Sequence, residues 1–224
     1  MIPLRSTERV YSPAVVTLSL IVVNTLIFLY QATLSPSALN EFVSQWGIVP
    51  DQMRGMGLIT LVTSMFLHGG WLHLIFNMLF LWVFGRNLED LIGGARFLVF
   101  YLLVGIIAGI VHVIVNAYSR MPTIGASGAI AGVMGAYLVK FPRARIVTLI
   151  PIFVFITTLE IPAPFLLLFW FATQFFSGIG SLATNDYTGG GVAWFAHIGG
   201  FLAGMLLIRM FPARQRWRAW YDED

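Results

Sequence analysis

The chain of 224 residues contains no cysteine and few charged side chains. Without cysteine it cannot form disulfides, thiol nucleophiles, iron–sulfur clusters or cysteine-type zinc sites. Charged residues make up 10% of the sequence, with 13 Lys or Arg and 10 Asp or Glu, whereas soluble domains contain about 25%. No basic run is present, so the charge pattern gives no support for nucleic-acid binding. The sequence lacks the polar residues that would cover a water-soluble surface.

Hydrophobic residues make up 58% of the chain and gather in blocks of the length that spans a bilayer as a helix, about 20 residues. The first block is too long for the apolar region of a signal peptide, and no Ala-x-Ala cleavage site follows it, so we expect it to be retained. We predict an all-α membrane protein with six transmembrane helices, at about Pro13–Leu34, Gly70–Gly85, Phe97–Ala117, Ser127–Val139, Pro162–Phe176 and Val192–Phe211. Residues 1–12 and 212–224 are then short tails around a core of residues 13–211.

The run Ile146–Phe176 is too long for a single span. Its 31 residues would extend roughly 46 Å as a helix, beyond a hydrocarbon core of roughly 30 Å. Pro151, Glu160 and Pro162 interrupt its first half, and proline disfavours a helix interior. We therefore expect Ile146–Glu160 to lie at the membrane interface and the fifth helix to start near Pro162.

The basic residues indicate how the helices are oriented, because cytoplasmic connections of membrane proteins carry an excess of Lys and Arg. The N-tail, the second and fourth connections and the C-terminal region hold 11 of the 13 basic residues. The first and third connections hold the other two, Arg54 and Arg120. We therefore predict that both termini are cytoplasmic. The second, fourth and sixth helices then run from the outer face inward.

Three polar motifs interrupt these apolar helices, and polar side chains inside a membrane are costly and by default suggest function. The motifs are His68, His73 and Asn77 around the start of the second helix, Gly125-Ala126-Ser127-Gly128 at the start of the fourth, and Ala196-His197 in the sixth. All three lie near the outer ends of helices that run inward. Their polar side chains are therefore predicted to share one layer, a few helical turns below the outer surface.

Small residues surround the serine and the histidine on their helices. At about 100° per residue, Gly128 and Gly132 fall near the face of Ser127, and Gly200 and Gly204 fall on the side of His197. Small residues at four-residue spacing let membrane helices pack with their backbones close together. We therefore expect the two helices to bring the serine and the histidine within hydrogen-bond reach.

A serine beside a histidine indicates nucleophilic catalysis. Serine is a weak nucleophile until a base takes its proton, and imidazole, with a pKa near neutrality, suits that task. The oxyanion formed at a scissile carbonyl needs preorganised hydrogen-bond donors. His73 and Asn77 are four residues apart on one helix face, and with the Ser127 backbone N–H they are the candidate donors.

These motifs, in this order and spacing, resemble the rhomboid intramembrane serine proteases. The resemblance rests on Gly125-Ala126-Ser127-Gly128, on His73-x-x-x-Asn77 with His68 five residues earlier, and on Ala196-His197-x-x-Gly200-x-x-x-Gly204. It covers the second to sixth helices and implies a six-helix rhomboid-like bundle. It also implies a Ser127–His197 dyad without a third acidic residue, and oxyanion stabilisation by His73, Asn77 and the Ser127 amide. Cleavage of transmembrane proteins near the outer face is the activity that follows.

The chain departs from the family pattern at two places. Four residues after the serine, where the best-known bacterial form has a tyrosine that stacks on the catalytic histidine, this chain has Ala131. The first connection contains Trp46 and Arg54 separately, rather than the Trp-Arg dipeptide of some members. The resemblance also implies that Phe76 and the Gln174–Phe176 region border the substrate entry side.

Other classes of protein lack support in the sequence. No His-Glu-x-x-His string of a zinc protease is present, and residue 129 is Ala, so the Gly-x-Ser-x-Gly elbow of soluble hydrolases is absent. An aspartyl intramembrane protease needs two aspartates within spans. The aspartates of this chain lie in connections or the tail, at Asp51, Asp90, Asp186, Asp222 and Asp224. A non-catalytic membrane protein that binds transmembrane clients or transports a solute is the alternative, although transporters more often show repeated spans.

We therefore expect a serine endopeptidase that is a multi-pass protein of a bacterial cytoplasmic membrane. Its expected partners are transmembrane protein substrates and the lipid bilayer. No metal, nucleic acid or soluble cofactor is expected. The residues expected to support or pack the site are His68, Gly125, Gly128, Gly132, Gly200 and Gly204.

Overall fold

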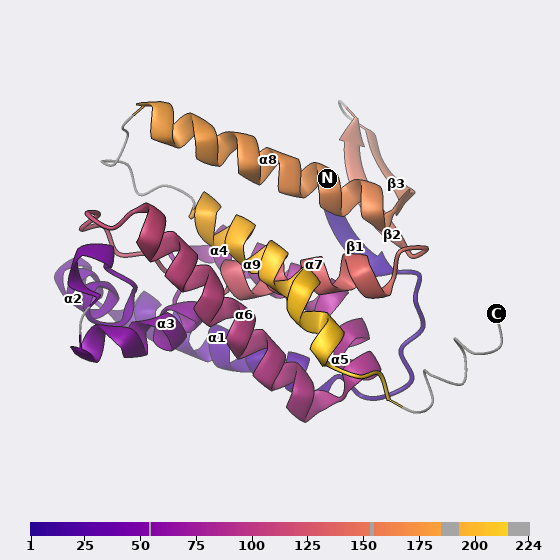
Figure 1. Cartoon of the computed structure of the whole chain (residues 1–224), viewed down its shortest axis with the longest axis horizontal. Coiled ribbons are helices and arrows are strands. Elements are labelled where there is room, and N and C mark those ends of the chain that lie inside the picture. Colours follow the sequence, from indigo (N-terminus) through magenta and orange to yellow (C-terminus); the bar gives the residue numbers. More distant parts are fainter. Residues whose placement is uncertain (54, 153–154, 185–192, 215–224) are drawn as a thin grey trace.

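The computed structural model describes residues 1–53, 55–152, 155–184 and 193–214, most of which are helical (Figure 1). The helices are α1 (Val15–Thr33), α2 (Pro36–Trp46), α3 (Thr60–Thr63), α4 (Trp71–Phe80), α5 (Arg86–Ile92), α6 (Gly94–Val115), α7 (Ser127–Lys140), α8 (Ala163–Thr184) and α9 (Trp194–Leu207). Short 3-10 turns cover Pro50–Gln52, Gly55–Ile59, Ser64–Phe66 and Ile208–Met210, and a π-helical turn, Leu81–Gly85, joins α4 to α5. Arg54, Arg216 and Arg218, used in predicting the orientation, and Val192, the predicted start of the sixth helix, lie outside the described residues.

Within the described residues, three helices are long and apolar enough to cross a membrane: Val15–Thr33, Gly94–Val115 and Ala163–Ser181. A fourth candidate span consists of Gly57–Phe66 and Trp71–Ile92, which are bent by 84°. Two shorter apolar helices, α7 and α9, complete the set. A helix thus lies at each predicted apolar segment, and the prediction of a mostly helical membrane bundle is confirmed.

The second predicted helix is longer than expected, because it continues past Gly85 to Ile92. The prediction ended it where charged residues begin, but Glu89 in this stretch is buried. Its carboxylate accepts the backbone N–H groups of Val16 and Thr17 at 2.9 and 2.7 Å. The first N–H groups of a helix have no intrahelical acceptor, and negative charge is favourable beside them. Glu89 therefore caps α1, which has no side-chain cap of its own.

A three-stranded antiparallel sheet corrects the prediction that the protein is all-α. Its strands, in the order β1-β2-β3, are β1 (Ile2–Ser6), β2 (Arg145–Ile152) and β3 (Phe155–Pro162). The stretch Ile146–Glu160, predicted only as interfacial, lies in the β2–β3 hairpin, where its β-branched Ile, Val and Thr residues favour strands. The predicted N-terminal tail supplies β1. The Ser6 hydroxyl bonds the Tyr137 hydroxyl of α7 at 2.6 Å, which ties the sheet to the bundle.

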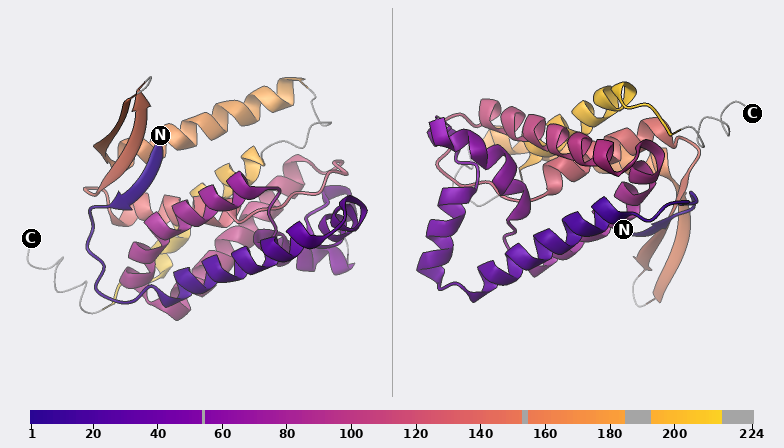
Figure 2. Two further views of the ribbon diagram at one scale, coloured as in Figure 1. Left: turned by 180° about the vertical axis from the view of Figure 1, so that it is seen from behind. Right: turned by 90° about the horizontal axis from the view of Figure 1, so that it is seen from below.

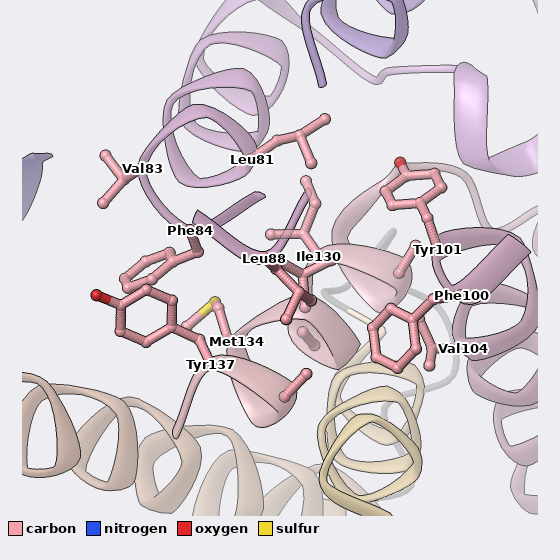
Figure 3. Close-up of a cluster of buried hydrophobic side chains, with 14 of the residues drawn as sticks. Leu81, Val83, Phe84, Leu88, Phe100, Tyr101, Val104, Ile130, Met134 and Tyr137 are labelled. Carbon is pink, nitrogen blue, oxygen red and sulfur yellow. The ribbon is translucent and has the colours of Figure 1, made fainter. Parts of the chain in front are cut away.

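α7 is the central helix, packed against α6, α9 and the π-helical turn. Its residues from Gly128 to Tyr137 are all buried. Figure 3 shows Met134 and Tyr137 of α7 beside Phe84 of the π-helical turn, within the main apolar cluster. A helix buried on all sides is set in place by its neighbours rather than by solvent. The start of α7, where Ser127 lies, is therefore held by the whole bundle.

α8 has a different position, along one edge of the bundle (Figures 1 and 2). It packs mainly against α9. Large apolar side chains on its outer face, such as Phe165, Leu168 and Phe176, are exposed, whereas Leu167 on its inner face is buried. α8 thus joins the bundle through one face only.

Candidate active site

Ser127 is the first residue of α7 and follows a turn that only glycine fits. Gly125 has φ +127° and donates its backbone N–H to the Ser64 carbonyl at 2.9 Å. A Cβ on Gly125 would lie 2.7 Å from Nε2 of His73. The positive φ and the close imidazole both exclude a side chain here. The turn therefore places Ser127 at the start of a buried helix, and His73 packs against Gly125, two residues before the serine.

His197 lies in the first turn of α9, is 7% exposed, and meets Ser127 across the helix interface. Its Nε2 is 2.8 Å from the Oγ of Ser127, although the two residues are 70 positions apart. This separation is that of a good hydrogen bond between a hydroxyl and an imidazole. The structure thus brings together the pair that the sequence motifs single out.

Glycines allow α7 and α9 to approach closely enough for this bond. A Cβ on Gly200 would overlap the carbonyl oxygen of Gly128, and one on Gly204 would overlap that of Gly132. A Cβ on Gly135 would likewise overlap a backbone carbonyl of α9. These five glycines, which we call the α7–α9 seam, put the two backbones in direct contact, as small residues do in membrane helices.

His73 and Asn77 of α4 both direct a side-chain nitrogen toward Gly125. Nδ1 of His73 accepts the Gly69 N–H at 3.3 Å, so in the neutral ring Nε2 carries the proton. Nε2 lies against Gly125, where it is the atom nearest to a Cβ on that glycine, and the Asn77 amide nitrogen would be 3.7 Å from the same Cβ. The Asn77 amide nitrogen is buried and has no hydrogen-bond partner in the described part of the chain. An unpartnered buried donor is rare and needs an explanation.

His68 lies behind His73, with ring centroids 5.1 Å apart at 67°. His68 is 2% exposed, and its two buried ring nitrogens have no hydrogen-bond partner among the described residues. Gln31 of α1 holds its backbone: the His68 N–H donates to Gln31 Oε1 at 3.0 Å, and Gln31 Nε2 donates to the His68 carbonyl at 3.3 Å. His68 thus supports His73 by packing. Gln31 was missed in the sequence analysis, although a glutamine in an apolar helix was a signal for such a contact.

A cavity of about 640 Å³ lies in front of these groups. Ser127, His197, His73 and Asn77 all line it, together with the Ser119–Ile124 segment that precedes the Gly125 turn. Its apolar lining includes Phe76, Phe80, Met134 and Trp170. The cavity is large enough for several residues of an extended peptide and combines an apolar wall with converging polar groups, as ligand sites do.

Two residues of α8 reach the site from the opposite wall. Oε1 of Gln174 is 2.7 Å from Nδ1 of His197, and the Trp170 ring lies 5.7 Å from the His197 ring at 37°. From the sequence, the Gln174 region was predicted only to border the substrate entry side, and no role was predicted for Trp170. The signal was the four-residue spacing of the two, which puts them on one helix face. Among the described residues, no group of three or more His, Cys, Asp or Glu is arranged to hold a metal.

Comparison with known proteins assigns the motifs to a family. A family profile described as the Rhomboid domain matches residues 56–214. The chain is 45% identical over 78 residues to Rhomboid protease GluP of Bacillus subtilis (strain 168), covering 35% of this chain and 15% of that protein. It is 30% identical over 159 residues to Rhomboid protein 1, mitochondrial, of Saccharomyces cerevisiae, covering 66% and 40%. It is 36% identical over 100 residues to Presenilin-associated rhomboid-like protein A, mitochondrial, of Danio rerio, covering 43% and 26%.

The matched part is less than half the length of each of these relatives. The profile match nevertheless extends over most of this chain and includes both residues of the hydrogen-bonded pair and the donors that face it. The resemblance inferred from the three motifs is therefore confirmed. This chain belongs to the rhomboid family.

Proposed function

We propose that the protein is an intramembrane serine endopeptidase in which Ser127 is the nucleophile and His197 the general base. The observation that carries the proposal is the 2.8 Å separation of Ser127 Oγ and His197 Nε2. A base within hydrogen-bond reach is what activates a serine hydroxyl. The cavity beside the pair gives a substrate carbonyl access to Oγ.

The proposed reaction proceeds through an acyl-enzyme. Nε2 of His197 takes the Ser127 proton as Oγ attacks the carbonyl carbon of the scissile peptide bond. The C–N bond then breaks, and His197 returns the proton to the leaving amine, which leaves an ester on Ser127. A water molecule, deprotonated by His197, attacks this ester and releases the new carboxyl group. Ser127 then recovers its proton.

Three donors are proposed to stabilise the oxyanion of each tetrahedral intermediate. Asn77 supports this role best, because its buried amide nitrogen has no hydrogen-bond partner among the residues that the structure describes. His73 presents Nε2–H beside Gly125, since its Nδ1 is an acceptor. The Ser127 backbone N–H lies in the first turn of α7, where N–H groups lack intrahelical acceptors. Donors held in place before reaction stabilise developing charge at little cost of reorganisation.

We propose transmembrane proteins as substrates, cleaved near the outer ends of their helices. The apolar side chains of the cavity suit an unwound transmembrane segment, and relatives carry the name of rhomboid proteases. The proposed setting is a six-span bundle with cytoplasmic termini in a bacterial cytoplasmic membrane. The helix at each apolar segment and the distribution of basic residues support it, and reporter fusions to both termini test the orientation.

The test is proteolysis of a model transmembrane substrate in detergent by the wild type, Ser127→Ala and His197→Ala. The wild type should cleave, and each variant should lose about 10⁴-fold or more in rate. A serine-reactive fluorophosphonate should label the wild type and not Ser127→Ala. Cleavage by Ser127→Ala at the wild-type rate would overturn the assignment, and a wild type that binds the substrate without cleaving it would favour a non-catalytic client-binding protein.

A further inference from the structure

His197 can accept the Ser127 proton in only one of its two neutral forms. Nε2 must present a lone pair to the hydroxyl, so the ring proton must lie on Nδ1. The group that faces Nδ1 therefore determines which of the two neutral forms is present. In this structure Gln174 Oε1 faces it at 2.7 Å, and an amide oxygen can only accept a hydrogen bond.

Neighbouring groups hold the Gln174 amide in that orientation. The Thr173 hydroxyl donates its single proton to the Trp170 carbonyl at 2.6 Å. Gln174 Nε2 lies 3.1 Å from the same hydroxyl oxygen, which has only lone pairs left to offer. The NH₂ group of Gln174 therefore points at Thr173, and its oxygen points at His197.

The reversed amide would be incompatible with catalysis at Ser127. It would place the Gln174 NH₂ against Nδ1 of His197, and Nδ1 would then have to accept. The ring proton would move to Nε2, leaving no lone pair to receive the Ser127 proton. The amide orientation thus decides whether the histidine is a base toward the serine.

Aromatic rings pack against the imidazole in addition to its two hydrogen bonds. Trp170 lies 5.7 Å from His197 at 37°, and Trp194 meets it edge-on at 6.3 Å and 90°. Ala131, four residues after the serine, has no ring to contribute. One face of α8 therefore provides both the acceptor for Nδ1 and a ring against the imidazole.

We infer that Gln174 is a positioning residue that fixes the proton of His197 on Nδ1, an inference that rests on the proposed protease function. Hydrogen bonds run in one direction from Ser127 Oγ through His197 and Gln174 to Thr173 and the Trp170 carbonyl. The acceptor is a neutral amide rather than a carboxylate. It selects the tautomer without adding a negative charge to balance the imidazolium, so turnover should be slow.

The direct test is the protonation of His197 in the resting wild-type protein. With ¹⁵N-labelled histidine in detergent micelles, and with His197→Ala used for assignment, the Nδ1 signal should be that of a protonated nitrogen and the Nε2 signal that of an unprotonated one. The reverse pattern would overturn the inference. This measurement needs no substrate and no altered Gln174.

The kinetic test uses Gln174→Met, which keeps the length of the side chain and removes the acceptor oxygen. We expect kcat to fall about 10- to 100-fold, the range of losing one hydrogen bond to a charged intermediate, with KM changed less than about twofold. Gln174→Glu keeps an acceptor oxygen and should recover most of this loss. Ile179→Leu, a change at an exposed position of the same helix, should behave as the wild type.

Wild-type kcat in a folded Gln174→Met protein would overturn the inference, and so would a Gln174→Glu protein as slow as Gln174→Met. Thermal unfolding in detergent monitors the fold of each variant, and the tautomer assignment decides the question should one of them unfold. The proposed protease function fails separately, through cleavage by Ser127→Ala. A protein that needs Ser127 but not Gln174 would keep the function and lose only this inference.

Discussion

The two sides of the Ser127–His197 pair are built differently. On one side, the α7–α9 seam brings two backbones into contact, and a Cβ on any of its glycines would strike a neighbouring helix. On the other side, His73 and Asn77 of α4 and Trp170 and Gln174 of α8 line the same cavity as the pair, and we call these four residues the side-chain wall. The seam has no space for any added side-chain atom, whereas the side-chain wall borders an open cavity.

This difference separates two requirements of a catalytic pair. The seam sets the distance between serine and histidine, because backbone contact leaves no rotamer to adjust. We propose that the side-chain wall sets the tautomer and ring plane of His197 and stabilises the oxyanion, which depend on individual atoms. A change in the seam should therefore damage fold and activity together, whereas a change in the wall should damage activity alone.

The largest effect is expected from Gly204→Leu, in the seam. Its side chain would have to occupy the space of the Gly132 carbonyl, and overpacking of this kind forces backbones apart. Displacement of a catalytic group by about 1 Å already costs about 100-fold in rate. We expect no stable folded protein in detergent by thermal unfolding, and no detectable cleavage.

The matched control is Leu206→Phe, which enlarges an exposed side chain of the same helix, α9. It should fold and cleave as the wild type does. A folded and active Gly204→Leu protein would mean that the helix approach does not depend on the seam.

A smaller effect, confined to activity, is expected from Asn77→Ala in the side-chain wall. Loss of one oxyanion donor lowers kcat by about 10²- to 10³-fold. The unfolding temperature should not fall, because the Asn77 amide nitrogen has no hydrogen bond to lose within the part of the chain that the structure describes. Steady-state kinetics and thermal unfolding in detergent measure the two quantities, with Ile75→Ala, at an exposed position of the same helix, as the control.

The unfolding temperature and kcat of Asn77→Ala together test whether the side-chain wall acts on activity alone. A lower unfolding temperature together with lower activity would make Asn77 part of the packing. Unchanged kcat in a folded variant would remove it from the oxyanion site.

The site was more predictable from the sequence than the fold around it. Ser127 and His197 could be paired because the basic residues predicted a common direction for their helices, and because Gly128 and Gly200 marked faces that pack closely. These are local patterns of spacing and composition. The contact of Gln174 with His197 was not predictable, since it depends on how far α8 is rotated and how near it lies to α9.

The sheet could not be predicted because hydropathy does not distinguish a buried strand from a membrane helix in a short apolar run. Ile146–Glu160 was predicted to lie at the membrane interface because its run is too long for one span and is interrupted by Pro151 and Glu160. Its partner β1 pairs Ile2 with Leu149, a contact across most of the chain. Likewise, the charged residues after Gly85 predicted a helix end, although Glu89 is buried as the cap of α1.

The smallest effect is expected on the outer face of α8, and it shows how little of that helix the site needs. Leu168 is 51% exposed, while its neighbour Leu167 is fully buried in the core cluster. In a bilayer an outward-facing leucine contacts lipid both in the folded and in the unfolded protein. Its truncation therefore loses little stability, because no hydrophobic force from water drives its burial. Leu168→Ala should therefore change stability by no more than about 0.5 kcal/mol and leave cleavage unchanged. Leu167→Ala should destabilise by about 2–5 kcal/mol, because it opens a cavity beneath the helix. Thermal unfolding of the two variants side by side measures the contrast. Equal losses of stability in the two variants would mean that both faces of α8 are packed. The α7–α9 seam would then not be the more rigid side of the site.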